Sequence, residues 1–277
     1  LYTLITRGPG GDSFEVISGL SAVHAPDGHA ALLGYFRSPE LAVVPLTVTE
    51  AGYRRDADGG LDLADPSVRA DLAALRDDGG APVTTAPGRI VAGLLARRLA
   101  GSGPLAIVSC DNLSGNGAVL ARVVGDLAAG VDASLADWIT GNACFVTTMV
   151  DRITPATTDE HRAAVASTLG VADAAPVPTE PFAEWVIQGE FPAGRPAWDA
   201  AGARIVGDVE PFERRKLTLL NGSHSLLAYA GSILGHETVA DAVADARCLA
   251  WVNQWWDEAC PQLPLPQVEL AAYRRAL

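Results

Sequence analysis

Residues 211–225 read PFERRKLTLLNGSHS and contain Lys216, the only lysine in this sequence of 277 residues. Every other basic residue among the 20 lysines and arginines is an arginine. Arginine keeps its charge in proteins, whereas the amine of a lysine can be tuned to release its proton. The single lysine is therefore a candidate acid–base residue.

Two polar residues follow Lys216 at spacings that favour a shared site. Asn221 comes five residues later and His224 eight residues later. On an α-helix of about 100° per residue they lie roughly 140° and 80° around from Lys216. We expect all three to face one cavity, where an amine, an amide and an imidazole can deprotonate an alcohol and hold its oxygen. The structural alternative is a solvated lysine and a core histidine.

The segment KLTLLNGSH resembles the signature of the long-chain polyol dehydrogenases, the family of mannitol dehydrogenase and fructuronate reductase. Four other segments resemble the same family, in the same order along the chain: LTVTEAGY (46–53), SCDNLSGNG (109–117), TMVDRITP (148–155) and EPFAEWVI (180–187). The resemblance therefore covers nearly the whole sequence.

This resemblance implies an NAD(P)-dependent oxidoreductase that interconverts a polyol or sugar acid and its keto form. Lys216 would be the general acid and base, Asn221 would stabilise the substrate oxygen, and His224 would orient substrate hydroxyls. Glu213, one helical turn before Lys216, could relay protons to solvent. Mannitol dehydrogenases of the family place Asn where this sequence has Thr147, a substrate-facing candidate expected at the carboxyl end of its strand.

The cofactor candidates follow two predicted strands. Glu50 comes after the apolar run 42–46, and Ser109, Asp111 and Asn112 come after the run 104–108, ahead of a glycine-rich turn. Ligands of open α/β sheets bind outside the carboxyl ends of strands. The resemblance raises these residues to candidate contacts of NAD or NADP.

The predicted fold is α/β, with an incomplete Rossmann-like domain over residues 1–210 and an all-helical domain over residues 211–277. Residues 8–11 are expected to form a hairpin turn around Pro9. A helix is expected over residues 86–100 with Arg97 on its outer side, and another over residues 241–256 with its tryptophans in the core. The family carries an upstream Gly-x-Gly-x-Phe unit and further downstream helices, so we expect the sequence to be part of a longer chain.

The net charge of −13 argues against nucleic acid or an anionic membrane as a partner. The four cysteines are isolated from one another, which is typical of a reduced, cytoplasmic protein and predicts no disulfide framework. His236 and Glu237 do not continue into a zinc-binding H-E-x-x-H motif, so no metal is expected.

Several choices stay open. The sequence does not separate mannitol–fructose from mannonate–fructuronate chemistry or NAD from NADP, and the oligomeric state is unknown. A non-catalytic protein that binds a sugar or nucleotide is the alternative from another class. A short-chain dehydrogenase is not favoured, because no Tyr-x-x-x-Lys motif precedes Lys216.

Overall fold

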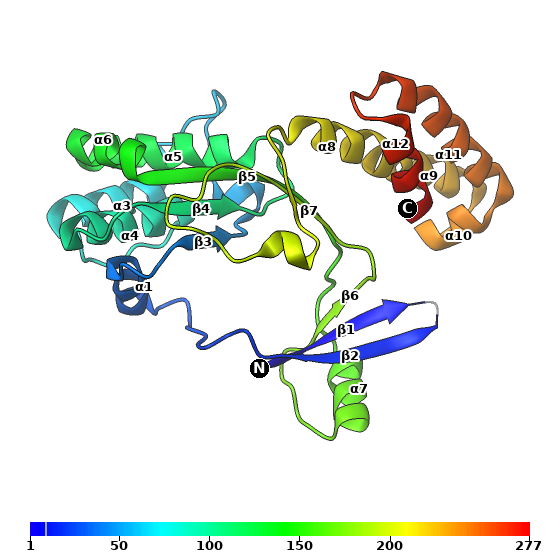
Figure 1. Ribbon diagram of the computed structural model, residues 1–277, viewed down its shortest axis with the longest axis horizontal. Coiled ribbons are helices and arrows are strands. Elements are labelled where there is room, and N and C mark those ends of the chain that lie inside the picture. Colours follow the sequence, from blue (N-terminus) through cyan, green and yellow to red (C-terminus); the bar gives the residue numbers. More distant parts are fainter. Residues whose placement is uncertain (9) are drawn as a thin grey trace. The chain divides into compact units, whose positions relative to one another are not determined.

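The computed structural model describes residues 1–8 and 10–277, so Pro9 of the predicted hairpin turn lies outside the described residues. The chain forms two compact units, Leu1–Ile205 and Val206–Leu277. Figure 1 traces both units along the sequence. Each unit is described separately below.

The first unit contains a five-stranded sheet with the order β3-β4-β5-β7-β8. Its strands are β3 (Val43–Leu46), β4 (Leu105–Ser109), β5 (Ala143–Asp151), β7 (Glu184–Gln188) and β8 (Arg204–Ile205). β3, β4 and β5 are parallel, as expected when helices connect successive strands. β7 pairs antiparallel with β5 and parallel with β8.

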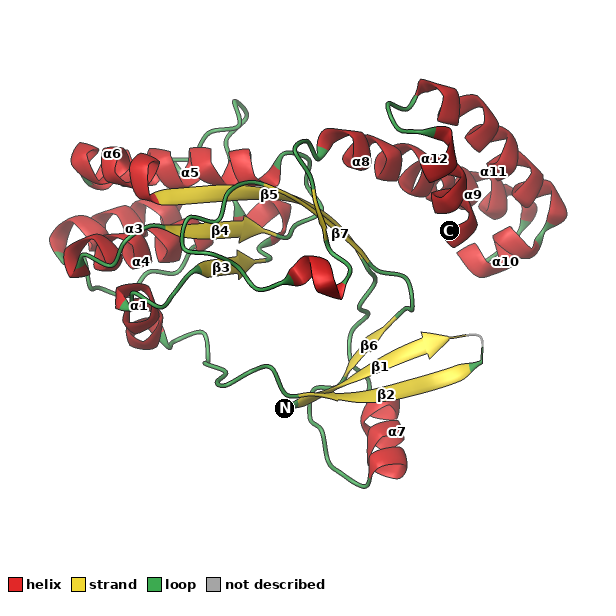
Figure 2. Ribbon diagram, in the orientation of Figure 1, coloured by secondary structure: helices red, strands yellow, loops and turns green. Residues whose placement is uncertain are grey.

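The first unit also contains helices that lie between its strands along the chain, as Figure 2 shows. They are α1 (His29–Arg37), α2 (Thr49–Gly52), α3 (Pro66–Asp77), α4 (Ala86–Ala100), α5 (Asn116–Val131), α6 (Ala133–Asn142), α7 (Asp159–Leu169) and the short 3-10 helix η1 (Trp198–Ala201).

The buried strand β4 separates two apolar layers. Leu105 and Ile107 belong to the large core shared with α4 and α5, while Ala106 and Val108 face a smaller cluster on the other side. Successive residues of a strand point to opposite faces, so a strand covered on both faces must be apolar throughout. This burial explains the continuous apolar run in the sequence.

A second, three-stranded sheet has the order β2-β1-β6. The hairpin of β1 (Tyr2–Gly8) and β2 (Gly11–Ile17) is antiparallel, and β6 (Val177–Thr179) pairs parallel with β1. The hairpin expected from the glycines around position 9 is therefore confirmed.

Arg97 is buried, and the prediction that it lies on the outer side of its helix is wrong. Its side chain is 1% exposed. All five of its N–H groups donate to backbone carbonyls: those of Phe36, Ser38, Leu41, Gly103 and Pro104. These carbonyls lie at the end of α1 and just before β3 and β4, so the guanidinium holds three segments together.

The second unit is helical and runs as α8 (Glu210–Arg215), η2 (Lys216–Asn221), α9 (Gly222–Leu234), α10 (Val239–Ala244), α11 (Ala246–Ala259), η3 (Cys260–Gln262) and α12 (Gln267–Ala276). η2 is a π-helical turn rather than a stretch of α-helix. The α/β fold followed by a helical part is thus confirmed.

The single helix expected over residues 241–256 is wrong, because the chain breaks at Asp245. Its extended backbone ends α10, and its side chain accepts the N–H of Arg247 to begin α11. Within the described part of the chain, every helix is too short or too polar to cross a bilayer.

Candidate active site

Asp111, directly after β4, fastens the turn that follows β3. One carboxylate oxygen accepts the backbone N–H groups of Val48 and Thr49, both at 2.8 Å. The other accepts the phenol of Tyr53 at 2.7 Å. The carboxylate is nearly buried, and Tyr53 is fully buried. Burial, and then the hydrogen bond to Asp111, raise the pKa of Tyr53 well above its usual value, so the phenol stays a donor.

This turn holds Thr49 in a strained backbone conformation. Its φ is +63°, in the left-handed region that a β-branched side chain disfavours. Such strain costs about 1–3 kcal/mol and persists where surrounding contacts impose it. The bond from the Thr49 N–H to Asp111 is one such contact. The next residue, Glu50, is exposed and pairs with Arg55 at 3.1 Å.

Ser109, Asp111 and Asn112 do not share one environment. Ser109 is fully buried and Asp111 nearly so, whereas Asn112 is exposed. The carbonyl of Ser109 accepts the hydroxyl of Thr148 at 2.6 Å. Ser109 and Asp111 are thus buried supports of this edge, and their contact with a cofactor stays a prediction.

The start of α5 is built to receive a polar ligand. Gly115, the residue before the helix, has a φ of +62° and no side chain of its own with which to cap this terminus. The first amides of a helix have no intrahelical partner, and the helix dipole favours negative charge there. The side-chain amide of Asn116 fastens this turn, since its nitrogen donates to the carbonyls of Asp111 and Thr148 at 2.9 and 2.8 Å. These donors fit a ribose or phosphate of a dinucleotide.

Thr147 lies beside this terminus, but not at the end of its strand. β5 continues to Asp151, because residues Thr147 to Asp151 pair with β7. The expected strand end is therefore wrong. Thr147 is nonetheless level with the carboxyl end of β4, since Val146 pairs with Val108. A Cβ on Gly117 would come within 2.6 Å of the Thr147 Oγ1, so this glycine allows α5 to approach the threonine closely.

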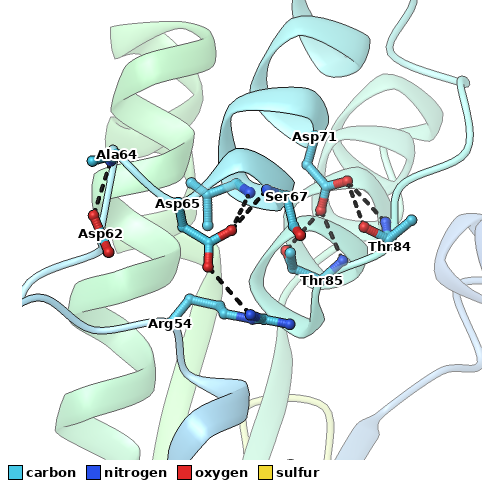
Figure 3. A network of polar contacts seen from close by, with 9 residues as sticks. Arg54, Asp62, Ala64, Asp65, Ser67, Asp71, Thr84 and Thr85 are labelled. Carbon is cyan, nitrogen blue, oxygen red and sulfur yellow. Dashed lines mark hydrogen bonds and ion pairs between the residues drawn. The ribbon is translucent and has the colours of Figure 1, made fainter.

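A cavity of about 520 Å³ lies next to the turn that follows β3. Glu50, Arg54 and Asp65 are among the residues of its lining. Asp65 caps α3 and accepts Arg54 at 3.2 Å (Figure 3). The hydrogen bond from the Val68 amide is the main cause of the lowered pKa of Asp65. In the same view, the buried Asp71 accepts the N–H groups of Thr84 and Thr85, both at 2.8 Å. Both carboxylates therefore support α3 and α4.

In the second unit, η2 carries Lys216 at its start and Asn221 at its end. Lys216 is 7% exposed, Asn221 and Glu213 are half-buried, and His224, on α9, is exposed. The expected α-helical angle of 140° between Lys216 and Asn221 does not apply here. A π turn bonds residues five apart, so it brings Asn221 one turn above Lys216.

Sequence reasoning named Thr49 beside Glu50 as a cofactor-side candidate, but it missed the backbone strain of Thr49 and the role of Tyr53. Tyr53 lies within the resemblance segment, but a tyrosine near a strand end has many structural uses. The π turn was also missed, because hydrophobic periodicity over a few residues does not separate it from an α-helix.

The side chains of His236, Asp245 and Cys248 each offer a ligand atom within 4.8 Å of the others. Asp245 already accepts the Arg247 guanidinium at 2.7 Å and the imidazole of His236 at 3.0 Å. The positive charge of Arg247 at this carboxylate opposes the binding of a metal ion.

Cys110 is a free thiol beside Asp111, and burial raises its pKa to about 11.

The first unit has parallel strands with polar residues after their carboxyl ends, and the second unit is helical and buries Lys216. The sequence model described as the mannitol dehydrogenase Rossmann domain matches residues 1–200, and that of the mannitol dehydrogenase C-terminal domain matches residues 208–277. The chain belongs to the mannitol dehydrogenase family.

Individual relatives support this family assignment. The D-mannonate oxidoreductase of Escherichia coli (strain K12) is 42% identical over 282 residues, covering 100% of this chain and 57% of the relative. The mannitol 2-dehydrogenase of Pyrenophora tritici-repentis is 39% identical over 275 residues, covering 95% of this chain and 48% of the relative. The chain therefore spans about half the length of the curated relatives that it matches.

Two solved structures are similar in fold. A substrate-free D-sorbitol dehydrogenase superposes with a TM-score of 0.91 at 34% identity, over 99% of this chain and 57% of that one. Pseudomonas fluorescens mannitol 2-dehydrogenase, in a ternary complex with NAD and D-mannitol, has a TM-score of 0.86 at 37% identity, over 99% of this chain and 56% of that one.

Proposed function

We propose that the protein is an NAD(P)-dependent dehydrogenase that interconverts a polyol or sugar acid and the corresponding ketone, with Lys216 as general acid and base. The observation that carries the proposal is the placement of the only lysine, buried on a π turn with Asn221 one turn away. π turns inside helices occur frequently at functional sites.

Each residue has a distinct role in this proposal. A bound nicotinamide would supply hydride transfer. Lys216 takes the hydroxyl proton during oxidation and returns it during reduction. The amide of Asn221 donates to the substrate oxygen as negative charge develops on it. His224 binds neighbouring substrate hydroxyls, and Glu213 passes protons to solvent.

In this proposal the cofactor binds at the carboxyl ends of β3 and β4 and at the start of α5. The first amides of α5 and the exposed Asn112 would contact the dinucleotide, and Glu50 would meet a ribose. Ser109 and Asp111 would hold this edge in place, since both are buried. The relative solved with NAD supports NAD as the first cofactor to test.

Substitution of Lys216 in the full protein tests the proposal. Oxidation needs the neutral amine and reduction needs the ammonium, so oxidation should have the higher pH optimum. Lys216→Ala should lower kcat in both directions by roughly 10²–10⁴-fold. Lys216→Arg should recover little, because arginine keeps its proton. A small primary amine added to Lys216→Ala should restore part of the oxidation rate.

Two results would contradict this proposal. If Lys216→Arg oxidised the alcohol at the wild-type rate with the same pH profile, the proton would be transferred elsewhere. Binding of NADH without any turnover across a panel of polyols and sugar acids would favour the non-catalytic binding protein.

A sugar acid is the second substrate candidate. D-mannonate oxidoreductase is among the relatives, and Thr147 replaces the asparagine that mannitol dehydrogenases of the family place there. A hydroxyl can still donate one hydrogen bond, but an amide offers two donors and a different reach. Thr147→Asn should raise kcat/KM for fructose relative to fructuronate. An unchanged ratio would place Thr147 outside the substrate site.

A further inference from the structure

The helix that carries Lys216 changes its hydrogen-bond spacing at one point. The N–H of Gly222 donates to the carbonyl of Leu217, five residues earlier, and α9 then resumes the α-helical spacing. The N–H groups before this point bond to the carbonyl five residues back, and those after it bond to the carbonyl four residues back. One carbonyl at the change is therefore passed over by the backbone N–H groups. The Gly222 N–H reaches Leu217, and at α-helical spacing the Ser223 N–H reaches Leu219, so the carbonyl passed over is that of the half-buried Thr218, which needs another donor.

Two neighbouring tryptophans of α11 provide donors here. The indole N–H of Trp255 donates to the Thr218 carbonyl at 2.9 Å. The indole N–H of Trp256 donates to the Leu219 carbonyl at 3.0 Å and to the Ser223 hydroxyl at 2.8 Å. The Ser223 hydroxyl itself donates to the Leu219 carbonyl at 2.5 Å. The Thr218 and Leu219 carbonyls are thus both bound by side chains.

Gly222 makes room for this arrangement. A Cβ at this position would lie 3.0 Å from the indole nitrogen of Trp255 and 3.2 Å from its ring carbon Cζ2. The indole therefore packs directly against the helix backbone. The expectation that the tryptophans of this segment lie in the core is wrong for Trp251 and Trp255, which are 41% and 40% exposed.

We propose that Trp255 and Trp256 are positioning residues that hold η2 in the π form and thereby keep Asn221 one turn from Lys216. This inference rests on the proposed roles of Lys216 and Asn221. If η2 relaxed to an α-helix, Asn221 would lie about 140° around the helix from Lys216. The Trp255 N–H stabilises the π form because it binds the Thr218 carbonyl that this form passes over, and the Trp256 N–H fastens the neighbouring Leu219 carbonyl to α11.

The experiment replaces each indole by a ring without an N–H. Trp255→Phe, Trp256→Phe and the double variant are compared with Trp251→Phe, a matched control on the same helix. Trp251 is 41% exposed, much like Trp255, and lies outside the proposed catalytic machinery. Amide hydrogen exchange of residues 216–223, kcat and KM are measured in the full protein.

The double variant should lose about 10- to 100-fold in kcat, because small displacements of catalytic groups have effects of this size. Its KM for the cofactor should stay within about twofold, since the cofactor edge belongs to other residues. Exchange of residues 216–223 should accelerate, whereas Trp251→Phe should change neither quantity. If Trp256→Phe does not fold, 3-benzothienylalanine at position 256 keeps the ring shape and removes only the N–H.

Wild-type kcat and wild-type exchange in both the double variant and the benzothienyl protein would overturn the inference. Failure of the proposed function would look different. In that case Lys216→Ala would retain the wild-type kcat, while the exchange of residues 216–223 would still report whether the indoles hold the π turn.

Discussion

The hydroxyl of Tyr53 donates a 2.7 Å hydrogen bond to the carboxylate of Asp111, which lies 58 residues further along the chain. The partner oxygen of the same carboxylate binds the two amides of the β3 turn. One buried phenol therefore helps to hold the turn in which the strained Thr49 begins α2 and Glu50 follows it.

Tyr53→Phe removes this hydrogen bond and should destabilise the protein. A hydrogen bond to a charged group contributes about 1.5–3 kcal/mol, and the carboxylate would keep its two amide donors. We expect a lower Tm and a KM for the cofactor that rises more than kcat falls. Tyr35→Phe, on the exposed pair with His24, is the control and should change neither. An unchanged KM in Tyr53→Phe would separate this turn from cofactor binding.

Thr49→Gly should stabilise the protein, against the usual effect of a glycine. Glycine adopts a positive φ without a steric penalty, so the substitution removes strain of about 1 kcal/mol or more. Thr47→Gly is the matched control, because Thr47 is also exposed but is not among the residues with positive φ. It should lower the stability. Chemical denaturation of the two variants provides the comparison, and a less stable Thr49→Gly would show that the threonine side chain outweighs the strain.

Arg97→Lys should cost about 2–4 kcal/mol although it keeps the positive charge. A lysine has three donors on one nitrogen and cannot reach the five carbonyls that the planar guanidinium binds. Arg98→Lys, one residue further and half-buried, should be nearly neutral, since it disturbs a surface ion pair with Asp132 and one hydrogen bond to the Ser134 hydroxyl. Equal melting temperatures for the two variants would contradict the proposed role of Arg97.

Asp245 should make the helical unit sensitive to acid. Hydrogen bonds from the guanidinium and amide of Arg247, and then from His236, hold the pKa of Asp245 well below its usual range. The folded state therefore gains stability above the unfolded pKa of about 3.9, and loses it as the pH falls through the lower folded value.

Substitution of Asp245 by Asn removes this dependence. Asp245→Asn should melt at a lower temperature than the wild type at pH 7, and the difference should shrink as the pH falls below about 4. Glu237→Gln, an exposed neighbour in the same unit, is the control. A difference in Tm that stayed constant from pH 7 to pH 2 would show that the cap, rather than the charge, matters.

Much of this fold could be predicted from local patterns. The continuous apolar run of β4 and the glycine-rich turn before α5 indicate a strand that is buried on both faces and then a helix. The lone lysine with Asn221 and His224 indicates a catalytic helix, because these residues are few and their chemistry is specific. The resemblance of ordered segments then determines the family.

Tertiary structure alone decided how these residues are held. Arg97 was expected on the outer side of its helix. It is buried because the carbonyls that bind its guanidinium come from other segments of the chain. Asp111 was predicted as a cofactor contact, and only the fold shows that its carboxylate also binds Tyr53 and two amides of the turn after β3. The form of the helix at Lys216 depends on indoles of α11, because a carbonyl passed over by the backbone ladder needs a donor that local sequence does not supply.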